Sequence, residues 1–141
     1  MATANVYANF FANAFNGNLL DIEDTDNLEC MLLDENHSFS ETNNTVDDIS
    51  ANEITDADYS RQTLTGVTVN RSTGTITVDA DDISFGSTVS ITASHAVIFA
   101  VGGTDETSYL MFDVDFEGSQ ESVDGEFTLQ IHEDGLFDVV T

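Results

Sequence analysis

Apolar and polar residues alternate along the second half of the chain, and this pattern predicts β-strands with one buried face. A different pattern spans Ala96 to Val101, where consecutive residues are apolar. A strand that is apolar on both faces is typical of the centre of a sheet. The alternating positions are Ile76 and Val78, and then Phe127, Leu129 and Ile131.

Turn residues separate these strands at short intervals. The segment 70–74 predicts a hairpin turn, and the acidic segment 79–82 predicts a second turn. A strand at 109–116 is followed by a polar stretch that predicts a loop, and a last strand is expected from Leu136 to Val140. Six to eight strands at this spacing predict a mainly β fold, an antiparallel, jelly-roll-like β-sandwich over residues 62–141.

The N-terminal segment 3–16 has the apolar spacing of an amphipathic helix, with Thr3 as its cap and Gly17 as its end. It contains no charged residue, so we expect it to pack along most of its length. It packs either on its own domain or on a neighbouring subunit. The residues that form the apolar face, and are therefore candidates for an interface, are Val6, Tyr7, Phe10, Phe11 and Phe15.

The chain between this helix and the β-rich half adds one strand and one long polar segment. Residues 28–33 predict a buried strand, in which Cys30 is a small core residue. The polar segment 34–60 is long for a connection, so we expect it to hold a short helix near 46–51 or to be an exposed functional loop. The length of 141 residues fits a single domain over 1–141.

Charge is the most extreme property of the composition. There are 27 acidic residues against two basic ones, Arg61 and Arg71, and the formal net charge is −25. Molar salt shortens the screening length to about 3 Å and so relieves the self-repulsion of such a chain. We therefore interpret the acidity as adaptation to high salt. Mimicry of nucleic acid and binding of cations or basic partners are the alternatives, and the charge sign opposes nucleic-acid binding.

The sequence shows no signal for secretion and no run near the 20 apolar residues of a membrane helix. We therefore expect a protein that is made in a cytoplasm and stays soluble, with no membrane partner. A single cysteine excludes an internal disulfide.

Candidate chemistry is sparse. The histidines His37, His95 and His132 lack zinc-site spacing; His95 is interpreted as a hydrogen-bonded core residue and His132 as a solvated strand end. The acidic clusters at 21–26 and 79–82 offer oxygen ligands but no calcium-loop pattern. No nucleophile motif or phosphate loop is present. We therefore expect no enzyme activity, no catalytic residues, no cofactor and no metal site.

Several segments follow one another in a recognisable order: 7–11, 31–34, a long loop with a histidine, 64–69, 78–85, 96–99, 110–116 and 135–137. This order resembles a family of small structural proteins encoded in the head-and-tail gene blocks of tailed viruses. The resemblance covers nearly the whole chain, and the missing basic residues point to a virus of halophilic archaea.

This resemblance implies a virion structural protein that decorates the capsid exterior as a decoration or turret-like component. Its partners would be other virion proteins, the major capsid protein above all, and further copies of itself in a homo-oligomer. The alternatives are a tail-associated structural or receptor-binding protein, with Tyr59 and Tyr109 as aromatic contacts, and a cellular acidic module that binds cations or a partner.

Overall fold

The computed structural model describes residues 3–15, 17, 27–132 and 137–140. As predicted, the fold is mainly β, with antiparallel sheets and one α-helix near the N-terminus. The face-to-face packing of two sheets that a sandwich requires stays a prediction. In the described residues, no helix has both the length and the apolarity to span a bilayer.

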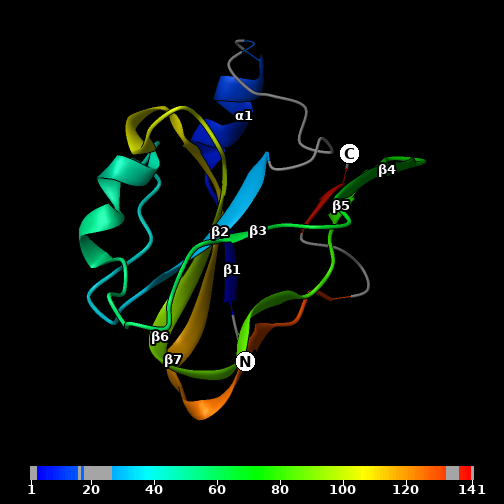
Figure 1. The fold of residues 1–141 in the computed structure, drawn as a ribbon. Coiled ribbons are helices and arrows are strands. Elements are labelled where there is room, and N and C mark those ends of the chain that lie inside the picture. Colours follow the sequence, from blue (N-terminus) through cyan, green and yellow to red (C-terminus); the bar gives the residue numbers. More distant parts are fainter. Residues whose placement is uncertain (1–2, 16, 18–26, 133–136, 141) are drawn as a thin grey trace.

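A five-stranded antiparallel sheet forms the body of the molecule, in the order β1-β7-β6-β2-β3 (Figure 1). Its centre is the predicted two-faced run 96–101, most of which lies in the long strand β6 and pairs with β2 on one side and β7 on the other. The bounds are Thr3–Val6 for β1, Leu28–Leu33 for β2, Gln62–Thr63 for β3, Ile83–Ala100 for β6 and Tyr109–Leu129 for β7.

The strand β7 runs through the polar stretch that the sequence predicted as a loop, so that prediction was wrong. Shifts in the pairing of β6 with β7 mark bulges, and Glu117 and Asp124 take positive φ angles of 57° and 48°. Bulges of this kind bend a strand pair without ending it. The stretch is polar because most of residues 117–126 are exposed, so its composition imitates a loop.

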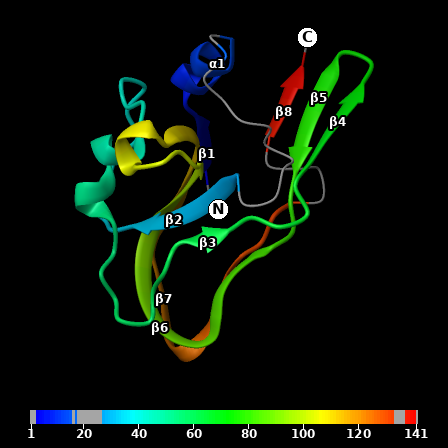
Figure 2. The same ribbon diagram turned by 45° about the horizontal axis from the view of Figure 1, so that its top comes forward.

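A second, three-stranded antiparallel sheet has the order β4-β5-β8 and projects to one side of the body (Figure 2). Its strands are β4 at Thr68–Ser72, β5 at Thr75–Asp79 and β8 at Phe137–Val140. The predicted hairpin at 70–74 and the predicted closing strand are both present. Gly74 has a φ of 75°, which suits the turn between β4 and β5.

The N-terminal segment differs from its prediction. Residues 3–6 form β1, which pairs with the edge of β7, and the helix α1 covers only Ala8–Phe15. Thr3 is therefore a strand residue and not a helix cap. The backbone N–H of Tyr7 donates a hydrogen bond to the carbonyl of Met111, and the chain passes from strand to helix at this residue. Gly17 does end the helix in the left-handed region, with its N–H bound to Ala14.

Both faces of the sheet are buried at its centre, because alternate residues of β2 and of the second half of β6 enter two different cores. Leu32 and Ile98 lie in the first core, which Phe85 and Phe127 cover from the curved ends of β6 and β7. Leu33 and Phe99 lie in the second. The fully buried central strand was predicted correctly, as were the buried strand 28–33 and Cys30.

The polar segment 34–60 covers the second core. It contains the expected short helical region, as two 3₁₀ turns, η1 at Val46–Asp48 and η2 at Ser50–Asn52. Val46 and Ile49 point into the core. Backbone hydrogen bonds tie the segment to β2 through Ile54 and to β7 through Leu110. The segment is therefore part of the fold, and it positions the site described next.

Candidate functional site

A cluster of three buried ionisable side chains lies under the 34–60 segment. Asp113 is fully buried, and its carboxylate lies between two imidazoles. His37 Nε2 is 2.8 Å from Asp113 Oδ2, and His95 Nδ1 is 3.3 Å from Asp113 Oδ1. The two imidazole rings meet edge to face at 4.8 Å. A ring nitrogen that carries its proton can donate to the carboxylate, and the tautomer of each ring sets which nitrogen that is.

Three different elements bring these residues together. His95 pairs with Asp115 across β6 and β7, and Asp113 pairs with Val97, so His95 and Asp113 are diagonal neighbours on one face. His37 reaches them from a turn just after β2, where its backbone N–H binds Asp34. Since Leu33, at the end of β2, pairs with His95, the turn begins beside that strand.

A fourth polar group is buried next to the cluster. The hydroxyl of Tyr7 has no hydrogen-bond partner in the described structure, and Tyr7 is 0% exposed. Burial, and then the nearby charge of Asp113, raise the pKa of Tyr7 well above its ordinary value. The carboxylate of Asp113 acts on the hydroxyl both by its charge and by a side-chain hydrogen-bonding interaction, although the contact falls outside the geometry of a full hydrogen bond. A buried hydroxyl without a partner costs stability.

An acidic depression of about 320 Å³ opens beside His95. His95 Nε2 lies 3.9 Å from Asp115 Oδ1, too far for a hydrogen bond but within range of an ion pair. The depression adjoins a shallow groove of about 510 Å³ that shares three of its residues, Glu35, Ser94 and Ser119. The remaining residues that line the depression are Glu117 and Gly118.

The other ionic centre of the described chain surrounds Arg61. Its guanidinium donates to Glu53 at 2.8 Å and to Asp105 at 2.7 Å, and it lies 5.5 Å from the centre of the Phe99 ring. The hydrogen bond to Arg61 holds the pKa of Asp105 below its ordinary value. This arrangement joins the 34–60 segment to the loop between β6 and β7.

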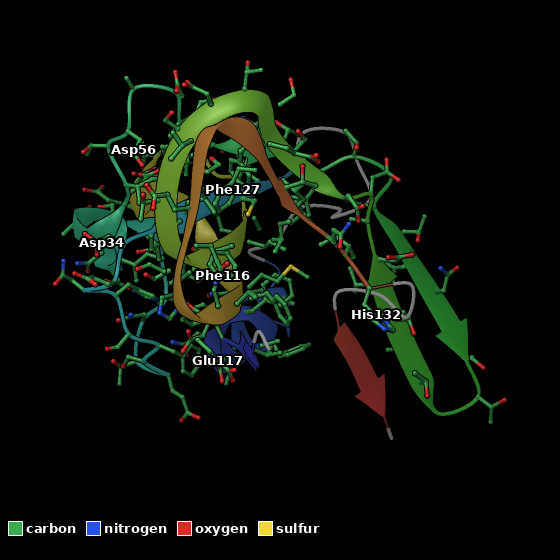
Figure 3. The ribbon with its side chains drawn as sticks, turned by 90° about the horizontal axis from the view of Figure 1, so that it is seen from below. Asp34, Asp56, Phe116, Glu117, Phe127 and His132 are labelled. Atoms are coloured by element: carbon green, nitrogen blue, oxygen red, sulfur yellow. The ribbon has the colours of Figure 1, made fainter. Side chains whose placement is uncertain are left out.

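The histidine predictions can now be compared with the structure. His95 is a buried, hydrogen-bonded core residue, as predicted. His132 is exposed, as predicted, although β7 ends three residues before it. Figure 3 places His132 beside the three-stranded sheet and Asp34 on the other side of the molecule.

The interface candidates lie largely against the chain's own core. Tyr7 and Phe10 are 0% and 5% exposed, so they are not available to a partner, and that interpretation of these two residues was wrong. Val6 and Phe11 are half-buried against the first core. The side chain of Phe15 lies outside the described residues.

The asparagine side chains of α1 also form hydrogen bonds within the same chain. Asn9 donates to the backbone of Glu41 and Asn43, and Asn13 donates to Asn44. Packing of the helix on its own domain is therefore the arrangement observed.

The acidic cluster 79–82 has structural hydrogen bonds. Asp81 accepts one from the Thr65 hydroxyl, and Asp82 accepts one from the Ile131 backbone. The cluster 21–26 lies outside the described residues. Tyr59 is half-buried, stacks on Phe85 and donates to Glu53, so it is not an exposed aromatic contact.

The convergence of His37, His95 and Asp113 was missed, because 76 residues separate His37 from Asp113. One sequence signal was available. His95 and Asp113 are ionisable residues that interrupt two otherwise apolar runs, in strands expected to be neighbours. A buried ionisable group requires a partner, so the two together indicate a polar centre inside the core.

Comparisons with protein-family models, with curated proteins and with solved structures found no match to this chain. The resemblance to structural proteins of tailed viruses therefore stays a prediction.

Proposed function

We propose that the protein is a virion structural component of a haloarchaeal tailed virus that decorates the capsid exterior and self-assembles through the β4–β5 hairpin. The observation that carries this proposal is the distribution of charge. Residues 61–78 contain no acidic residue and hold both arginines of a chain with 27 acids. A surface that must meet another copy of so acidic a protein has to avoid repulsion between like charges.

The hairpin also offers apolar surface. Val69 pairs with Val78, and Ile76 lies two residues before Val78 in β5, so these three residues share one face of the sheet. Val78 is buried in the first core, whereas Val69 and Ile76 are 38% and 41% exposed. An apolar strip therefore runs from the core outward along the projecting hairpin. Exposed apolar residues at the edge of a sheet favour pairing with another chain.

The charges favour a second copy of this chain as the partner that binds the β4–β5 hairpin. The strand β4 forms one edge of the three-stranded sheet, and antiparallel pairing of two β4 edges would bring two acid-free segments together. Such a contact is self-complementary and closes with two-fold symmetry. Repeated copies around a capsid axis are what a decoration protein requires.

The hairpin supplies a direct test. We expect Val69→Asp to convert the oligomer into a folded monomer in molar KCl, because Val69 lies in β4 and the substitution places a carboxylate beside the pairing edge of both copies. The matched control is Val123→Asp, since Val123 is 70% exposed and lies in β7. Mass from light scattering after size exclusion measures assembly, and circular dichroism checks the fold. A monomeric wild type, or equal masses for both variants, would count against assembly through the hairpin.

A cellular module that binds cations is the second candidate function, and the cluster of His37, His95 and Asp113 is the observation that favours it. The two functions predict different locations for the protein. A virion component is enriched in purified particles, whereas a cellular module stays in the host fraction.

A further inference from the structure

We propose that His37, His95 and Asp113 form a binding site for one divalent transition-metal ion, with Zn²⁺ as the ion that fits best. The sequence predicted no metal site, and the inference does not depend on a viral origin. Each residue offers one ligand atom, and these atoms lie within 4.8 Å of one another. All three residues are buried.

The donor set favours zinc over the hard cations of a salt-rich cytoplasm. Two imidazole nitrogens and one carboxylate oxygen suit Zn²⁺ and its neighbours in the transition series. Ca²⁺ and Mg²⁺ prefer oxygen ligands alone, which the many surface carboxylates supply. Binding at the histidines can therefore be separated from general attraction of cations to an acidic surface.

The distances are close to those of a coordinated ion. Zinc bonds of 2.0–2.2 Å in a tetrahedron place neighbouring ligand atoms about 3.3 Å apart. The contacts of His37 and His95 to Asp113 measure 2.8 and 3.3 Å and involve its two different carboxylate oxygens. One ligand atom from each of the three residues lies within 4.8 Å of the others, so the ion would take the place of these direct contacts.

The charge of Asp113 gives a second reason. A buried carboxylate requires a compensating cation or a dense set of hydrogen bonds. Arg61 is bound to Glu53 and Asp105, so it does not serve this purpose. In the described structure the two imidazoles contact Asp113, and the Tyr7 hydroxyl lies beside it. A bound metal ion would place a positive charge next to this carboxylate.

Two neighbouring groups fit the surroundings of a metal site. Asp115 faces the second ring nitrogen of His95, and a carboxylate in this position orients a histidine ligand and raises its basicity. The hydroxyl of Tyr7 is buried beside Asp113 without a hydrogen bond of full geometry, so it belongs to the same polar centre.

The fold also indicates how a cation would reach the cluster and what its binding would change. The acidic depression beside His95, with Glu35 and Glu117 at its wall, leads cations toward the cluster. Since His37 belongs to the 34–60 segment, a bound ion would join this segment to β6 and β7. The role that follows is structural: the ion locks the cover of the second core in place.

Calorimetric titration of the full chain with ZnCl₂ in molar KCl tests the site. We expect one saturable Zn²⁺ per chain, and affinity at least about 10-fold weaker in His37→Gln. His132→Gln is the matched control, because it removes a histidine outside the cluster and should leave the affinity unchanged. Equal affinities in wild type and His37→Gln, or no saturable binding by folded wild type, would overturn the proposal.

Nitrogen NMR of the wild-type histidines provides a readout that does not depend on a variant that folds. Zn²⁺ should shift the Nε2 resonance of His37 and the Nδ1 resonance of His95 and leave the ring of His132 unchanged. The same pattern is not expected with MgCl₂. Zn²⁺-dependent shifts at His132 alone, or at none of the three rings, would contradict the assignment.

Discussion

Transfer from molar KCl to dilute buffer is expected to unfold this protein. With a net charge of −25, the folded chain holds its acids closer together than the unfolded chain does. The screening length grows from about 3 Å at 1 M salt to about 30 Å at 0.01 M, so distant acids begin to repel one another. We expect the melting temperature, followed by circular dichroism, to fall by tens of degrees on dilution.

A variant with fewer charges separates screening from other effects of concentrated salt on hydrophobic packing. Asp47, Glu106 and Glu121 are exposed acids. In the described structure their side chains accept no hydrogen bond. Replacing them with Asn, Gln and Gln should lower the salt concentration at the folding midpoint. A midpoint that does not move, or a wild-type melt that is the same in dilute and molar KCl, would show that repulsion is not what salt relieves.

The second large effect is expected at Arg61. Arg61→Met should lower the free energy of unfolding by about 2 kcal/mol, because Glu53 and Asp105 would face each other without a cation. Breaking a fully buried pair costs about 3–5 kcal/mol. The lower figure applies because the three side chains are 19–40% exposed and their charges are partly screened. Denaturant unfolding in molar KCl measures the difference.

Two further variants show whether geometry or net charge is responsible. Arg61→Lys keeps the charge but loses the paired hydrogen bonds, so it should fall between wild type and Arg61→Met. Gln120→Glu adds the same negative charge at an exposed position and should change stability little. If Gln120→Glu destabilises as much as Arg61→Met, the ion pairs are not the cause.

The pH dependence of this ion pair has a defined sign. Arg61 lowers the pKa of Asp105, so the pair stabilises the fold fully above the ordinary carboxyl pKa of about 4. This contribution is lost as the pH falls through the lowered value. Arg61→Met should remove this part of the acid sensitivity.

Much of the fold was predictable because apolar spacing is a local property. The central strand at 96–101, the buried strand 28–33, the 70–74 hairpin and the short helix near residue 46 all follow from nearby residues. The N-terminal segment was misjudged because 3–6 have too few residues to distinguish helical from strand spacing. Their pairing with β7, more than 100 residues away, decides the outcome. The polar part of β7 was missed for a similar reason, since its pairing with β6 overrides a loop-like composition.

The site could be predicted only in part. Apolar surroundings were enough to place His95 in the core, because burial follows from the strand pattern. Its partner Asp113 and the third residue, His37, depend on strand register and on a turn that no local pattern reveals. The charge distribution is different, because the absence of acids from residues 61–78 can be read from the sequence. Only the structure shows that most of the β4–β5 hairpin in this stretch projects from the body.

Mass spectrometry of tailed-virus particles, purified in molar salt from a lysate of the host, tests the central claim most directly. The chain has no lysine, so a carboxyl-reactive cross-linker is the suitable reagent. A virion structural protein predicts that the chain copurifies with the major capsid protein in many copies per particle and forms cross-links on its exterior. Particles that lack the chain, while it is abundant in the host fraction, would contradict the account.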